Sequence, residues 1–108
     1  MATQQEHIEQ LKKMTRRPSP PGALLEELLE NTGLSQSAAA ARMGVARATI
    51  SRLIHGHHPL TPDLASRLGR LFGNGPSLWL KMQQQVDLWD ILHEDEKRYA
   101  HIEPVKAA

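Results

Sequence analysis

The 108-residue sequence predicts an all-α protein built around one small hydrophobic core. Hydrophobic residues make up 40% of the chain but aromatic residues only 4%, so mainly Leu, Ile, Ala and Met must fill that core. Such a composition suits packed helices better than strands, which favour aromatic and β-branched side chains. Apolar residues also recur at helical spacing, and no alternating pattern typical of a strand is found. We therefore expect a bundle of five helices.

The first two expected helices are bounded by residues with known preferences for helix ends. Leucines recur at helical spacing over 21–31, PGALLEELLEN, with glutamates on the other face. Pro21 suits the first turn of this helix, and Gly33 suits its end. Ser35 can accept bonds from the free amides of a second helix, and Gly44 ends that helix.

Three further helices follow. The third covers about 46–55 and stops at Gly56. The fourth begins with Thr61 as its N-cap and Pro62 at its first position. After the turn sequence GNGP, a fifth helix covers about 76–93.

The proline-rich stretch TRRPSPPG divides the chain. We expect a loosely ordered extension over 1–20, whose first thirteen polar residues form a loose helix or remain disordered. The helical domain should cover 21–93, and a charged tail should cover 94–108.

Charge is unevenly distributed although the net charge is only +1. No acidic residue occurs over 31–62, a window that contains Arg42, Arg47 and Arg52, whereas 87–103 is rich in Asp and Glu. This asymmetry suggests two surfaces with different partners. The alternative is that both are ordinary solvated faces.

The second and third helices have the pattern of a helix-turn-helix. The turn between them, MGVA, is short, and its glycine can adopt a left-handed conformation. A small residue, Ala40, precedes Gly44 by one turn, and apolar Ile50 and Leu53 follow at the spacing of this motif. In DNA-binding proteins of this type, the second helix of the pair enters the major groove.

The outward face of the third helix has side chains that suit a DNA groove. Small residues permit close approach, Ala48 can touch a thymine methyl group, and an arginine can bond both acceptors of guanine. Free amides at the start of the second helix favour a phosphate. Each arginine taken alone could serve solubility only, and Arg42 either contacts a phosphate or is solvated. The predicted DNA-binding residues are Ser35, Gln36, Arg47, Ala48, Thr49, Ser51, Arg52, His55 and His57.

The histidines at 55, 57 and 58 also allow a metal site to be considered. Histidine is a common zinc ligand, but the chain has no cysteine, and a loop of this kind ordinarily needs ligands from elsewhere. We therefore expect no metal and no cofactor, with the loop lying over the DNA backbone.

The fifth helix is apolar on more than one face. Leu78, Met82, Val86 and Trp89 form one stripe, which we interpret as the interface of a homodimer. Such a dimer would present two recognition helices about 34 Å apart to an inverted repeat. Alternatively, this helix simply closes the bundle.

Residues from about 14 to 92 resemble the HigA (VapI-like) antitoxins, a family within the phage-repressor-like, XRE-type helix-turn-helix proteins. The resemblance rests on PGALLEELLE, on GLSQSAAAARMGVARATISRLIHGHHPLTPDLASRLGRLFG, and above all on PSLWLKMQQQVDLW. It implies a homodimer that binds double-stranded operator DNA, represses its own operon and neutralises a HigB/RelE-like toxin that cuts mRNA. Three features depart from the family pattern: SPPG stands where His-Pro-Gly is common, Ala39 where leucine is usual, and residues 1–13 extend the start.

Other functions remain open at this point. A stand-alone XRE-type repressor without a toxin would have the same DNA-binding residues, and a protein-interaction or metal-dependent module would use the acidic tail and the histidines. Catalysis is not expected, because neither a cysteine nucleophile nor a Gly-rich phosphate loop is found. The sequence contains no membrane-spanning apolar run and no apolar signal core, so we expect a cytoplasmic protein.

Overall fold

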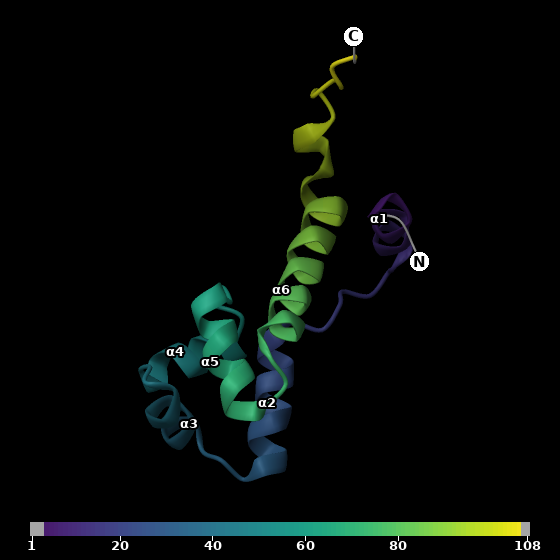
Figure 1. The fold of residues 1–108 in the computed structure, drawn as a ribbon. Helices are drawn as coiled ribbons and strands as arrows, with labels where there is room; N and C mark the ends of the chain where they lie inside the picture. The colour runs from purple at the N-terminus through teal and green to yellow at the C-terminus, as the bar shows by residue number, and fades with distance from the viewer. Residues whose placement is uncertain (1–3, 107–108) are drawn as a thin grey trace.

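The computed structural model describes residues 4–106, except for the side chains of residues 4, 95 and 96. Within this range the chain is helical and contains no strand, which confirms the predicted all-α class. The last helix continues through a π turn, η1 (Ile91–Asp95), into a 3-10 turn, η2 (Glu96–Tyr99). The α-helices are α1 (Gln4–Lys13), α2 (Pro21–Thr32), α3 (Gln36–Met43), α4 (Arg47–Ile54), α5 (Pro62–Phe72) and α6 (Pro76–Asp90) (Figure 1).

Helices α2–α6 correspond to the five expected helices, and their ends follow local capping chemistry. The Ser35 hydroxyl accepts a hydrogen bond from the Ala38 amide at 3.0 Å, and the Thr61 hydroxyl accepts one from the Leu64 amide at 3.2 Å. The sequence placed the end of the fifth helix at 93, whereas the α-helical hydrogen bonding changes to a π turn after Asp90. Residues 4–13, for which helix and disorder were both open, form α1.

The core lies between α2, α3, α4, α5 and the first half of α6. Its largest fully buried side chains are Trp79, Leu25, Ile50 and Leu68. Although the chain has few aromatic residues, Trp79 therefore supplies much of the core volume. Its indole N–H donates to the Asn74 side-chain oxygen at 2.8 Å, so the buried nitrogen has a partner.

Helix α6 extends away from the body formed by α2–α5, and α1 lies beside its far half (Figure 1). The described chain is accordingly elongated, with extents of 54 × 25 × 22 Å. The segment between α1 and α2 is held to α6 by two contacts: Arg17 forms a two-point ion pair with Asp90, at 2.8 and 2.9 Å, and the Trp89 indole donates to the Met14 carbonyl at 3.1 Å. None of the helices in residues 4–106 is both long enough and apolar enough to cross a membrane.

Candidate nucleic-acid interface

Helices α3 and α4 meet at a tight turn over residues 44–46. Gly44 has φ 70° and ψ 34°, a left-handed conformation that is unfavourable for residues with a Cβ atom. The Val45 amide donates to the Ala40 carbonyl at 3.0 Å, which satisfies a carbonyl at the end of α3. Beyond the turn, Ile50 is 0% exposed and Leu53 is 2% exposed. The core therefore holds α4 by one face only.

The opposite face of α4 is open to solvent. Arg47, Ala48, Arg52 and His55 are exposed, and Ser51 between them is half-buried. At the rotation of an α-helix these five residues span an arc of about 140°. Thr49 lies half-buried at the flank. The structure thus brings five of the six residues predicted over 47–55 onto one accessible face, which contains two arginines, two small residues and one histidine.

The start of α3 provides the remaining predicted contacts. Ser35 is exposed, but its hydroxyl is already engaged as the N-cap of α3. Gln36, the first residue of α3, is half-buried. The expected capping role of Ser35 is confirmed, and its expected contact with DNA stays a prediction. A serine that acts as an N-cap can still donate its backbone amide and accept a second hydrogen bond at its hydroxyl oxygen.

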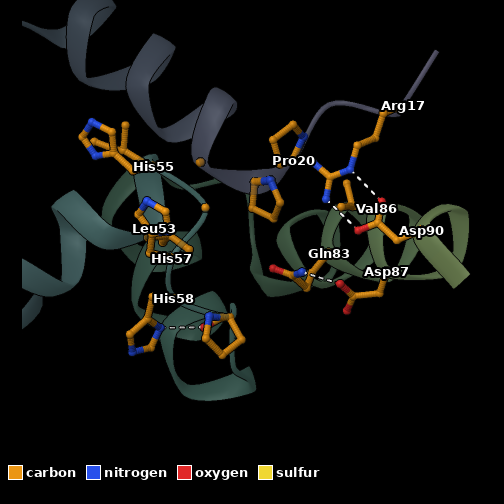
Figure 2. A pocket seen from close by; sticks show the side chains of 15 residues that line it. Arg17, Pro20, Leu53, His55, His57, His58, Gln83, Val86, Asp87 and Asp90 are labelled. Carbon is orange, nitrogen blue, oxygen red and sulfur yellow. Dashed lines mark hydrogen bonds and ion pairs between the residues drawn. The ribbon is translucent and has the colours of Figure 1, made fainter. Parts of the chain in front are cut away.

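The histidine loop after α4 has its own geometry. His55 donates from Nδ1 to the Ser51 carbonyl at 2.7 Å, and the His57 backbone amide donates to the Arg52 carbonyl at 2.8 Å. Because a carbonyl only accepts, Nδ1 of His55 must carry a proton. The loop forms one wall of a cleft of about 560 Å³, opposite Arg17, Gln83, Asp87 and Asp90 (Figure 2). His55 and His57 therefore lie at the end of α4 remote from Arg47, next to this cleft.

The charged groups across the cleft satisfy one another. The hydrogen bond from Arg17 lowers the pKa of Asp90, partly opposed by burial of the carboxylate, and the same bond raises the pKa of Arg17. Gln83 donates to the Asp87 carboxylate at 2.9 Å and accepts from the Leu60 amide at 3.1 Å. In the described part of the chain, no three His, Cys, Asp or Glu side chains are arranged to hold a metal ion.

Two residues that were not predicted from the sequence contact the backbone of the helix-turn-helix. Arg67 of α5 donates from Nη1 to the Met43 carbonyl at 2.6 Å and from Nε to Asp63 at 2.9 Å. Gly22 of α2 lies so close to α4 that a Cβ there would overlap the Leu53 carbonyl oxygen. The i,i+4 spacing of Asp63 and Arg67 could have indicated their ion pair, but no local signal points to Met43.

Comparison with known proteins identifies the family. Residues 25–80 match the family model described as helix-turn-helix. The chain is also 38% identical over 96 residues to the antitoxin HigA-1 of Vibrio cholerae, an alignment that covers 88% of this chain and 90% of that protein. The chain belongs to the HigA family of helix-turn-helix proteins. The predicted phage-repressor-like, XRE-type fold is thereby confirmed.

Two proteins with the same fold have been solved with DNA. One is the HigA antitoxin of Pseudomonas aeruginosa with the higBA promoter, 29% identical with a TM-score of 0.75, covering 83% of this chain and 100% of that one. The other is the Pseudomonas aeruginosa protein PA4674 in complex with its operator DNA, 30% identical with a TM-score of 0.73, covering 84% of this chain and 98% of that one. HigA-like chains of this architecture therefore occur in complexes with promoter or operator DNA.

In this HigA-family chain the stripe predicted as a dimer interface does not form one exposed surface. Val86 is 2% exposed because it packs within its own chain, whereas Leu78 is 44% exposed. Met82 and Trp89 are half-buried, and Trp89 donates its indole N–H to the chain's own N-terminal segment. A different apolar row, Leu80, Leu88 and Ile91, lines an open hollow of about 360 Å³ on α6.

Proposed function

We propose that this chain is an antitoxin that binds operator DNA as a homodimer, represses its own operon and neutralises a HigB/RelE-like, mRNA-cleaving toxin. The observation that carries the DNA-binding part is the orientation of α4. Its apolar face is locked in the core through Ile50 and Leu53, while Arg47 and Arg52 stand on the accessible face. A helix fixed on one side and basic on the other is what major-groove recognition requires.

In this proposal, different side chains of α4 contact different parts of the DNA. Arg52, on the exposed face one turn beyond Ala48, donates to both acceptors of a guanine, and Ala48 leaves room for a thymine methyl group. Arg47 lies at the start of the helix, which enters the groove first. The first amides of α3, next to Ser35 and Gln36, bind a phosphate that sets the register. The DNA-bound Pseudomonas aeruginosa structures support the DNA-binding part of the proposal.

Dimerisation through α6 completes the DNA-binding unit. The far half of α6 stands outside the body of the domain, and Leu88 near its end and Ile91 at the start of η1 are only half-buried. A second copy packing on this row would remove apolar surface from water and place two recognition helices on an inverted repeat. Because Val86 is buried within its own chain, the stripe predicted from sequence is a poor interface. The proposed interface is therefore the row of Leu80, Leu88 and Ile91.

The toxin-binding part of the proposal rests on the family. The Vibrio cholerae relative is named an antitoxin, and residues 87–103 of this chain are acidic, which is complementary to a basic partner. The second candidate is a repressor without a toxin, which would share every DNA-binding feature.

A gel shift with the DNA upstream of the chain's own coding sequence tests the proposal, performed with and without the product of the neighbouring gene. We expect a shift by the chain alone, competed by unlabelled upstream DNA but not by a scrambled duplex. A change in the complex on adding the neighbouring product, together with lost mRNA cleavage by that product, supports the antitoxin. If the neighbouring gene's product does not alter the shift, the stand-alone repressor is favoured. Absence of any sequence-specific shift would contradict both candidate functions.

A further inference from the structure

Arg67 reaches from α5 across to the end of α3, immediately before the turn of the helix-turn-helix. Its Nη1 donates to the Met43 carbonyl at 2.6 Å, the shortest of its contacts. Met43 is the last residue of α3, where carbonyls have no partner within the helix. A guanidinium placed there satisfies such a carbonyl and complements the negative end of the helix dipole.

A second contact fixes the direction of the guanidinium. Nε of Arg67 donates to the Asp63 carboxylate at 2.9 Å, one helical turn earlier on α5. The planar guanidinium is therefore held through Nε and Nη1 at once, which a lysine ammonium could not reproduce. The arginine lies directly over the turn, because a Cβ at Gly44 would be 3.3 Å from Nη1.

The turn itself is largely open to solvent. Gly44 and Ala46 are exposed and Val45 is half-buried, whereas the core contacts of α3 and α4 lie on the inner side, through Met43, Ile50 and Leu53. The angle at which α4 leaves the turn decides where Arg47 and Arg52 stand. A hydrogen bond to the final carbonyl of α3, immediately before the turn, restricts that angle.

We propose that Arg67 is a positioning residue for DNA recognition: it sets the orientation of α4 through Met43 and is itself aimed by Asp63. This inference rests on the proposed binding of operator DNA by α4. It predicts that losing this hydrogen bond weakens discrimination between sequences more than it weakens binding to DNA in general, because the charged face of α4 stays intact while its placement against the bases loosens.

The test compares Arg67→Gln, Arg67→Lys and Asp63→Asn with the unaltered chain. Arg70→Gln, which removes a positive charge from an exposed position of the same helix, is the matched control. Each protein is titrated with the upstream duplex and with a scrambled duplex of equal composition, at several salt concentrations. Circular dichroism and thermal melting confirm that each variant is folded at the assay temperature.

We expect Arg67→Gln and Arg67→Lys to lose roughly tenfold in affinity for the upstream duplex, with little change for the scrambled duplex and an unchanged salt slope. Asp63→Asn should show a smaller loss of the same kind, and Arg70→Gln should behave like the unaltered chain.

Three outcomes overturn the assignment. Equal losses on both duplexes, with a salt slope reduced by about one, would make Arg67 a direct phosphate contact. Unchanged affinities with a lower melting temperature would make it a purely structural residue. Unchanged affinity and sequence preference in Arg67→Lys would show that a positive charge at this position is enough for recognition. If Arg67→Gln does not fold, the comparison of Arg67→Lys and Asp63→Asn with the unaltered chain tests the proposal. Failure of the unaltered chain to prefer the upstream duplex would instead contradict the proposed function itself.

Discussion

Gly22 at the start of α2 packs directly against the carbonyl of Leu53 near the end of α4. A Cβ at this glycine would overlap the Leu53 oxygen and lie 2.8 Å from the Ile54 oxygen. Both neighbours are backbone atoms, which cannot move aside as a flexible side chain can. The first turn of α2 therefore packs directly against the end of α4.

Replacement of this glycine should destabilise the domain. We expect Gly22→Ala to lower the free energy of unfolding by about 1–3 kcal/mol, because α2 and α4 must separate to admit the methyl group. Urea unfolding followed by circular dichroism measures the change. The exposed neighbour provides the control, since Ala23→Ser should change stability by no more than about 0.5 kcal/mol. Equal stability of Gly22→Ala and the unaltered chain would show that this contact can relax without cost.

Arg52 should carry base recognition. Arg52→Ala is expected to cost about 1–3 kcal/mol of specific binding and to relax the preference at one base pair. Binding measured against a library of single-base variants of the upstream duplex tests both effects. Arg70→Ala on α5 controls for the loss of one exposed positive charge. An Arg52→Ala protein with unchanged affinity and preference would remove Arg52 from the recognition surface.

Acid should weaken the attachment of the N-terminal segment. Arg17 lowers the pKa of Asp90, so the stabilisation is complete above the unfolded-state pKa of about 3.9 and is lost as the pH falls through the lower folded-state value. The effect should be at most about 1 kcal/mol, because the two side chains are 46% and 32% exposed.

The Asp90→Asn variant isolates this contribution. Its unfolding free energy should fall below that of the unaltered chain at pH 6, and the difference should shrink as the pH is lowered through 4 toward 2. Glu27→Gln, an exposed carboxylate on α2, serves as the comparison. A pH-independent difference between Asp90→Asn and the unaltered chain would argue against the ion pair as its cause.

Leu88 should be needed for the proposed homodimer. We expect Leu88→Glu to shift sedimentation from dimer to monomer and to weaken operator binding, because a charge would enter the apolar row of α6. Leu78→Glu tests the stripe predicted from sequence, and it should leave the dimer intact. Val86→Glu is unsuitable, since this side chain is buried within its own chain and the variant should unfold. A dimer broken by Leu78→Glu and not by Leu88→Glu would return the interface to the original stripe.

The elements that could be predicted from the sequence are those governed by near neighbours. The Ser35 cap acts on Ala38, three residues away, and the Thr61 cap acts on Leu64. The accessible face of α4 also followed from sequence, because the rotation of a helix relates residues within two turns.

The faces of α6 could not be assigned in the same way. This helix is apolar nearly all round, so periodicity alone cannot tell a core face from an interface. Only in the folded chain are Trp79 and Val86 buried while Leu88 and Ile91 stay half-buried. The predicted stripe mixed residues from these two environments.

By itself, therefore, the sequence determined the helices, their caps, the glycine turn and the set of side chains that α4 presents. The tertiary structure decided the contacts between elements: Gly22 of α2 lies against Leu53 of α4, Arg67 of α5 binds Met43 of α3 across 24 residues, and Arg17 ties the N-terminal segment to Asp90 of α6 across 73 residues. Capping and helical periodicity depend on atoms a few bonds apart along the chain. These contacts instead join segments that meet only when the core has closed, so no local pattern encodes them.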